Sequence, residues 1–320
     1  MPIKHTGDAP DLLLPYQFTL PNNFALTETS PCPMLKMVRA ETDSLIESLT
    51  SYFSARKDVA FAFLFGSYAK GIERNTSDLD IGVYFFPRGE LWELEEDVVY
   101  PTEGEIWGDL DALTGKEIDL LILNRASARI VYTALTEGIP LAVRSPSLYW
   151  TILLQAGRLL EEYLDFTSSF LEVKNRSTSL SSLDRERIVR ILDFMRSELQ
   201  DARLFTSLTY EAYTTQSSLR RNLERWVENL VNASIDIAKI LLASEKHPLP
   251  QTYRETLFRL KTLSGFQEEW VEKLSEYARL RNILAHEYID IRFKYLADFV
   301  SEAEALYVKF IEATEHFLTH

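Results

Sequence analysis

Three aspartates stand where acidic side chains are uncommon. Asp78 and Asp80 lie two residues apart at the start of the apolar run 78–86, and Asp119 lies inside the apolar run 117–123. Side chains two apart on a strand point the same way, so Asp78 and Asp80 project together. Three carboxylates on neighbouring strands repel one another unless a cation lies between them. Magnesium is the expected cation, because it prefers carboxylate oxygens and brings phosphate with it.

A Gly-Ser pair adds a second element to this pattern. Gly66 and Ser67 follow the apolar run 59–65, and ten residues separate them from Asp78. Glycine lets the chain turn and approach a ligand closely, while Ser67 and nearby backbone N–H groups can hold a phosphate. Either motif by itself usually marks a surface turn. The complete set, with each part on its expected element, indicates metal-dependent chemistry on a phosphate.

The elements that must position these residues form a small α/β region. The runs 59–65, 78–86 and 117–123 predict three buried strands. A helix is expected over 34–53, where the apolar residues recur at helical spacing, and a short helix over 106–115. This mixture predicts one small α/β domain.

Four regions are predicted along the chain. Residues 1–35 contain several prolines and no lasting periodicity, which predicts an extended arm. Residues 36–145 are assigned to the α/β domain, and 146–181 to a connecting helix and a Ser-rich linker that ends in a helix cap at Ser182 or Asp184. Residues 182–320 show helical spacing and no strand candidates, which predicts an all-α domain. Its helical patterns lie at 188–199, 219–235, 267–284 and 293–317.

The helical region contains a second group of residues that could do chemistry. Arg281, His286 and Tyr288 form the pattern R-x4-H-x-Y. Five residues on a straight helix turn by about 500°, which leaves Arg281 and His286 roughly 140° apart. The two side chains can therefore meet only if the helix ends near Ala285 or if two chains share the site.

Composition excludes several classes of protein. The chain has 320 residues, of which 46% are hydrophobic and 26% charged, as in a globular protein. No apolar run approaches the ~20 residues of a membrane span, so a cytoplasmic location is expected. One cysteine and five scattered histidines exclude a disulfide and a Cys- or His-rich metal centre. A net charge of −14 argues against a protein that coats nucleic acid. One local basic patch is expected from Arg279, Arg281, Arg292 and Lys294.

The first motif resembles the minimal nucleotidyltransferases (MNT) of the DNA polymerase β superfamily, over residues 60–141. The resemblance implies that Asp78 and Asp80 bind metal and a nucleoside triphosphate. It implies that Asp119 binds the catalytic metal and helps to deprotonate an acceptor hydroxyl. The reaction would be in-line attack on the α-phosphate of ATP, with two Mg²⁺ ions per site. Lys70 stands where the family commonly has an arginine. The implied nucleotide-binding residues are Gly66, Ser67 and Lys70.

The second motif resembles the HEPN family, whose small helical domains often act as metal-independent ribonucleases; the resemblance covers 182–320. In that family the Arg and His of two protomers face a shared cleft. The resemblance implies that His286 acts as acid or base on the RNA, that Arg281 stabilises charge on phosphate, and that Asn282 assists. It also implies RNA, including tRNA, as a partner and a homodimer formed through this domain.

The two families occur together in toxin–antitoxin pairs, in which the transferase adds AMP to the tyrosine of R-x4-H-x-Y. The resemblance therefore implies that the N-terminal domain adenylylates Tyr288, in cis or across a dimer, and so blocks the ribonuclease cleft.

Two other functions remain open from the sequence. A drug-modifying, aminoglycoside-type nucleotidyltransferase also joins this core to helices, and the acidic stretch 90–111 could attract a cationic acceptor. The third possibility is a non-catalytic module whose helical half serves as a dimer scaffold or an RNA-binding surface.

Overall fold

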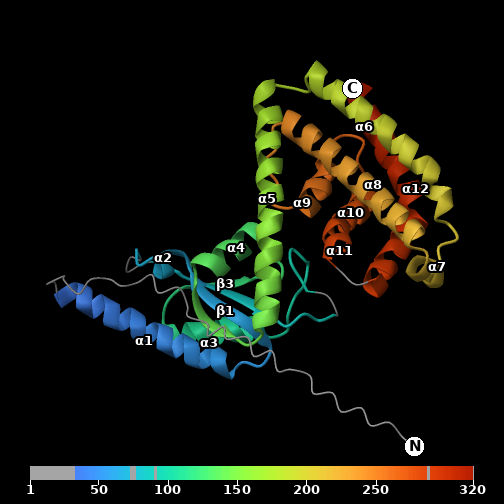
Figure 1. Cartoon of the computed structure of the whole chain (residues 1–320). Coiled ribbons are helices and arrows are strands. Elements are labelled where there is room, and N and C mark those ends of the chain that lie inside the picture. Colours follow the sequence, from blue (N-terminus) through green and yellow to red (C-terminus); the bar gives the residue numbers. More distant parts are fainter. Residues whose placement is uncertain (1–32, 73–76, 90–91, 287–288, 320) are drawn as a thin grey trace, which may run out of the picture. The chain divides into compact units, whose positions relative to one another are not determined.

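The computed structural model describes residues 33–72, 77–89, 92–286 and 289–319 (Figure 1). Within these residues, four strands form one mixed sheet in the order β3-β2-β1-β4. Strand β1 is antiparallel to β2 and to β4, whereas β2 and β3 are parallel. The strands are β1 (Val59–Phe65), β2 (Leu79–Phe85), β3 (Ile118–Ile122) and β4 (Ile139–Val143).

Three of these strands agree with the apolar runs of the sequence, because each carries side chains that the sheet buries. The residues from Val59 to Leu64 of the central strand β1 are at most 3% exposed. The edge strand β4 was not anticipated. It contains Pro140, which lacks a backbone N–H and argues against a central strand but is compatible with an edge.

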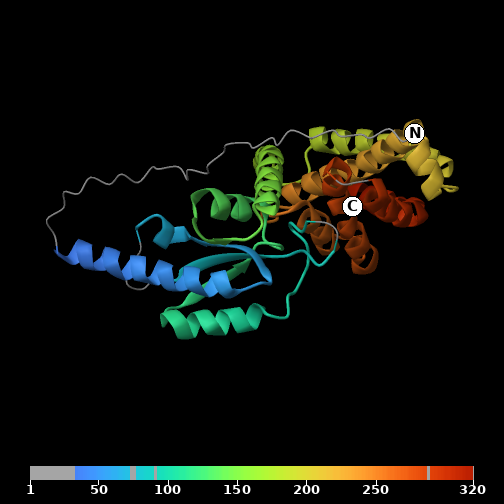
Figure 2. The same cartoon turned by 60° about the horizontal axis from the view of Figure 1, so that its bottom comes forward.

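Helices cover both faces of the sheet. Helix α4 (Ala128–Glu137) and the first half of α5 (Pro146–Arg176) pack against β1 in a core that includes Phe61, Val131 and Ile152. Helix α3 (Glu103–Thr114) lies on the opposite side (Figure 2).

Helix α1 (Pro33–Ala55) begins within the predicted arm 1–35, whose residues 1–32 lie outside the described part of the chain. In its last turns, Leu49 and Phe53 are buried, and the Tyr52 hydroxyl donates to Asp109 of α3 at 2.8 Å.

A buried polar network fixes the irregular segment that follows β2. The Tyr84 hydroxyl donates to the Glu93 carbonyl oxygen at 2.7 Å and accepts from the Glu93 backbone N–H at 2.9 Å. The Asn124 amide donates to the Glu93 carboxylate and to the Tyr100 hydroxyl, each at 2.9 Å. Buried polar groups with several partners resist displacement. The network therefore holds the acidic residues 93–97 in a defined position.

The C-terminal half is all-α in the part that the structure describes, as predicted. Helix α8 is its central element: residues 237–244 are buried on every side, as in a core helix. The α-helices are α6 (Ser182–Gln200), α7 (Tyr210–Thr215), α8 (Ser217–Ser244), α9 (Tyr253–Phe258), α10 (Glu268–Glu276), α11 (Leu280–His286) and α12 (Ile289–Thr319).

Two helix boundaries differ from the sequence expectation. The cap of α6 is Ser181, whose hydroxyl accepts the Asp184 N–H at 3.1 Å. Neither of the two predicted caps, Ser182 and Asp184, is in that position. The predicted helix 267–284 is divided, because a 3₁₀ turn at Tyr277–Arg279 separates α10 from α11. Short 3₁₀ segments of this kind change the direction of the chain. Here the change comes just before the R-x4-H-x-Y motif.

Helix α5 belongs to both hydrophobic cores. Its residues Ile152, Ala156 and Leu159 pack with the sheet, whereas Phe166 and Phe170 pack with the helical half. One continuous helix therefore joins the two cores. Among the helices of the described residues, none has the length and apolar character that crossing a membrane requires.

Candidate active sites

The sheet brings two of the predicted aspartates side by side. Asp80 of β2 and Asp119 of β3 are register partners on parallel strands. Partners in this arrangement share one face of the sheet, with their strands about 4.8 Å apart. Asp78 immediately precedes β2, two residues before Asp80. The three acids thus gather at the start of two neighbouring strands.

The pKa of the Asp80 carboxyl is raised above its ordinary value. The largest cause is burial, followed by the negative charges of Asp119 and Asp78. The Ser67 backbone N–H donates a hydrogen bond to the Asp80 carboxylate and acts in the opposite direction. Burial and like charges both disfavour the ionised form, so a cation placed here would relieve the repulsion.

Gly66 makes room for the Asp80 carboxylate. Its backbone φ of +71° lies in the left-handed region that glycine adopts readily. A Cβ atom at this position would lie 2.0 Å from the Asp80 Oδ2 atom and 2.7 Å from its Cγ atom. Only glycine fits this turn, and Ser67 follows it with its N–H directed at the same carboxylate.

The acidic group fits magnesium that is shared with a phosphate ligand. In the described ranges, no three Asp, Glu, His or Cys side chains are arranged to hold a metal ion on protein ligands alone. Magnesium is ordinarily held by one or two carboxylates, and water and substrate phosphates supply the other ligands. The neighbouring carboxylates of Asp80 and Asp119 meet that requirement.

Lys70, which was expected to contact the nucleotide, is engaged elsewhere. Its ammonium lies 3.0 Å from the Glu137 carboxylate at the end of α4, and both side chains are about half exposed. Exposed ion pairs of this kind contribute little energy. Lys70 would have to exchange this partner in order to bind a triphosphate.

In the helical half, Arg281 makes two specific contacts. Its guanidinium lies 2.9 Å from the Glu162 carboxylate of α5 and 4.3 Å from the centre of the Tyr253 ring. The side chain is 23% exposed. Sequence reasoning missed both partners, because they lie far from Arg281 along the chain and carry no motif.

Helix α11 also carries Asn282 and His286. The backbone places Asn282 within α11 and His286 at its last position. Tyr288, the predicted acceptor of AMP, lies outside the described residues.

The predicted basic patch is largely neutralised by acidic side chains. Arg279 lies 3.1 Å from Glu96, and Arg292 lies 3.1 Å from Glu224. Lys294 is exposed. The expected patch is therefore mostly an array of ion pairs.

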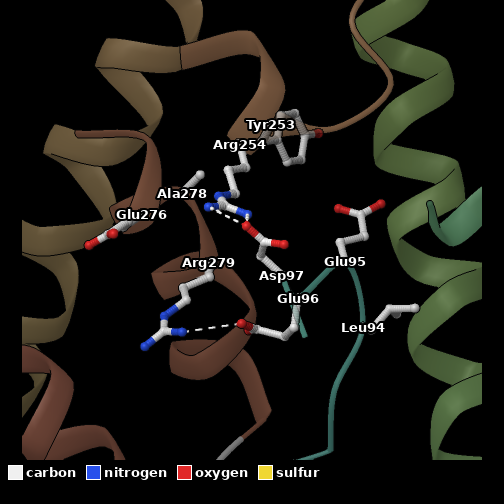
Figure 3. A pocket seen from close by; sticks show the side chains of 9 residues that line it. All are labelled: Leu94, Glu95, Glu96, Asp97, Tyr253, Arg254, Glu276, Ala278 and Arg279. Carbon is white, nitrogen blue, oxygen red and sulfur yellow. Dashed lines mark hydrogen bonds and ion pairs between the residues drawn. The ribbon is translucent and has the colours of Figure 1, made fainter. Parts of the chain in front are cut away.

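The acidic segment after β2 and the helical half enclose a cavity of about 380 Å³. Figure 3 shows Glu96 directed at Arg279 and Asp97 directed at Arg254, the second pair at 3.3 Å. Part of the acidic stretch that was expected to attract a cationic drug is therefore already paired with arginines of this chain.

Comparison with known families gives two matches. Residues 47–147 match the family described as polymerase beta, nucleotidyltransferase. Residues 195–314 match the family described as ribonuclease HepT-like. Both resemblances expected from the motifs are confirmed. Among curated proteins, no match was found.

Two solved structures illustrate more distant similarity. One is a crystal structure of a toxin–antitoxin with AMP-PNP, to which this chain is 18% identical. The match covers 41% of this chain and 95% of the other chain, with a TM-score of 0.32. The other is a tri-AMPylated Shewanella oneidensis HEPN toxin in complex with MNT antitoxin. It is 16% identical, covers 42% of this chain and 95% of its own, and has a TM-score of 0.30. Neither similarity is close enough to transfer the role of a residue.

Proposed function

The chain joins a polymerase β-type nucleotidyltransferase region to a HepT-like region, and we propose that the first modifies the second with AMP from ATP. Domain limits of 36–145 for the transferase, 146–181 for the connection and 182–320 for the HEPN domain are part of this proposal. The observation that carries it is the pairing of Asp80 with Asp119 beside Gly66. A cytoplasmic location, where ATP, magnesium and RNA are all present, is also part of the proposal.

In the proposed transfer, Asp78, Asp80 and Asp119 would hold two magnesium ions together with the triphosphate. When bound, magnesium supplies neutralisation of the phosphate charge and polarises the reacting phosphoryl group. The Ser67 hydroxyl holds a terminal phosphate. Asp119 accepts the proton of the acceptor hydroxyl, whose oxygen forms a bond to the α-phosphorus. The bond from that phosphorus to the bridging oxygen breaks, and pyrophosphate leaves.

The proposed acceptor is the hydroxyl of Tyr288, in the same chain or in the partner of a homodimer. Its place in R-x4-H-x-Y, two residues after His286, supports this choice. An adenylyl phosphodiester would add a bulky group and a negative charge where an RNA phosphate must lie. Modification would therefore shut off the helical half.

The proposed target of this control is a metal-independent ribonuclease. His286 would move protons to and from the RNA 2′-OH and the leaving oxygen, Arg281 would stabilise the phosphate charge, and Asn282 would assist. The Glu162 carboxylate, 2.9 Å from Arg281, must give way when RNA binds.

The test is intact-mass measurement of the purified chain before and after incubation with ATP and magnesium. We expect a gain of one AMP in the wild-type chain and no gain in Asp80→Asn or Tyr288→Phe. A gain that persists in Tyr288→Phe would contradict the proposed acceptor. No gain in the wild-type chain, together with nucleotide transfer to an aminoglycoside, would favour the drug-modifying alternative.

A further inference from the structure

A second cavity of about 310 Å³ lies where α5, α8 and α11 meet, and we call it the arginine pocket. Four guanidinium groups line it, those of Arg158, Arg221, Arg225 and Arg281. Three carboxylates also line it, and this leaves a formal excess of one positive charge. Such a concentration of arginine is unexpected in a chain with a net charge of −14. The composition of the pocket suggests a ligand with negatively charged oxygens.

Hydrogen bonding of Arg158 is incomplete. Its Nε atom is buried and has no hydrogen-bond partner. Its Nη1 atom lies 3.7 Å from the Glu162 carboxylate, too far for a normal hydrogen bond. Leaving a buried donor unpaired is unfavourable, because the group has lost its hydrogen bonds to water. The Nε–H of Arg158 is therefore available to donate to an anionic oxygen without the loss of an existing hydrogen bond at that atom.

One carboxylate serves two guanidinium groups in this pocket. Glu162 lies 2.9 Å from Arg281 and 3.7 Å from Arg158. It therefore stands where an oxyanion shared by both arginines would bind. Guanidinium groups prefer planar, two-point contacts with carboxylate or phosphate. A phosphate between Arg158 and Arg281 would replace Glu162 and provide more acceptor oxygens than a carboxylate.

The remaining two arginines are held only by weak contacts. Arg221 donates to the Ser217 carbonyl oxygen at 3.1 Å and to the Ser217 hydroxyl at 3.2 Å. Arg225 pairs with Glu228 at 3.0 Å, and its side chain is 69% exposed. Contacts this exposed contribute little to stability, because solvent screens them. Both groups are free to turn toward a ligand.

We propose that the arginine pocket binds phosphate groups of RNA next to the one that Arg281 contacts, and that Glu162 occupies one phosphate position in the RNA-free protein. The inference rests on the proposed ribonuclease function of the helical half. It adds Arg158, Arg221 and Arg225 to the RNA-binding surface.

The connecting helix thereby takes part in RNA binding. Arg158 stands next to Leu159, which packs in the core of the transferase half. The packing of Leu159 in that core therefore fixes where Arg158 lies in the arginine pocket. No motif in the sequence indicated this contribution.

The test uses the full-length chain and a fluorescent single-stranded 2′-O-methyl RNA, which the ribonuclease cannot cleave. Binding is measured over a range of salt concentrations. For single strands, each phosphate contact contributes about 0.7 to the slope of log affinity against log salt. We expect Arg158→Gln and Arg221→Gln each to lower the magnitude of the slope by about 0.7. Arg158→Lys retains the charge and should keep most of the wild-type slope. Glu162→Gln should bind more tightly than the wild-type chain.

Matched controls have the same charge change outside the pocket. Arg190→Gln removes an exposed arginine from α6, and Glu172→Gln removes an exposed carboxylate from the same helix as Glu162. Neither should alter the slope beyond the general effect of one charge. If Arg158→Gln and Arg190→Gln give the same slope, the inference is wrong.

Two further results separate this inference from the ribonuclease itself. Suppose that Arg281→Ala abolishes RNA cleavage while the Arg158 and Arg221 variants bind RNA as the wild type does. The proposed role of the arginine pocket is then wrong, and the proposed ribonuclease activity is supported. If no RNA is cleaved but the salt slopes of the variants change as expected, the proposed ribonuclease activity is wrong and the RNA-binding role of the arginine pocket is supported. Thermal stabilisation by inorganic phosphate alone, with unchanged RNA slopes, would mark a site for the free anion and overturn the RNA assignment.

Discussion

Replacing Gly66 by alanine should disable the transferase by displacing one carboxylate. The new Cβ atom would lie 2.0 Å from Asp80 Oδ2, whereas ordinary contact begins at 3.4 Å. The oxygen must therefore move by about 1.4 Å. The Cγ atom, at 2.7 Å, is also too close, so rotation of the carboxylate alone cannot relieve the clash. A misplacement of about 1 Å can cost about 100-fold in rate.

The substitution also has a cost that does not depend on Asp80. Alanine at a φ of +71° is strained by about 1–2 kcal/mol. For a domain of roughly 100 residues, each kcal/mol shifts the melting temperature by about 4–8 °C. A fall in stability by itself is therefore not informative about the site.

Gly71 provides the matched control. Its φ is +65°, and a Cβ atom there would meet nothing within 4 Å. Gly71→Ala therefore carries the same backbone strain without the contact with Asp80. We expect both variants to melt a few degrees lower, and only Gly66→Ala to lose about 100-fold in AMP incorporation. Incorporation is measured by intact mass over time. Equal activity of the two variants would refute the role of Gly66 in positioning Asp80.

Other predictions follow from the charged groups. Because the folded-state pKa of Asp80 is raised, its ionised form destabilises the fold at neutral pH. Without magnesium, Asp80→Asn should therefore have a higher melting temperature than the wild type. Added magnesium and ATP should not change the melting temperature of this variant. Burial raises the pKa of Glu95 to about 7, while the Ala128 N–H donates to its carboxylate at 2.9 Å. The stability that Glu95 contributes is complete below its ordinary pKa and is lost as the pH rises through about 7, so Glu95→Gln should flatten the melting temperature between pH 5 and 8. Tyr288→Phe should leave RNA cleavage intact but make it insensitive to ATP and magnesium, as an endpoint cleavage assay can show.

Many elements of the fold could be predicted because their signals are local. The continuous apolar run of β1 and the two-residue spacing of Asp78 and Asp80 are readable from neighbouring residues. Strand β4 could not be read in this way, because Pro140 and its short length conceal an edge strand that only pairing with β1 completes. The 3₁₀ turn at Tyr277–Arg279 was missed for a related reason, since apolar spacing continues through it.

The closeness of Asp80 and Asp119 was implicit in residue type and spacing, because the strand period of two and strand pairing bring them side by side. The environment of each charged group, by contrast, could not be read from residue type and spacing. Glu96 meets Arg279 across 183 positions of sequence, and Glu162 meets Arg281 from another helix. Contacts of this kind depend on how the cores pack around α5, and no pattern within a short stretch of residues records that packing. The sequence alone therefore proposed candidate reactive side chains, whereas the three-dimensional packing decided which of them are already paired.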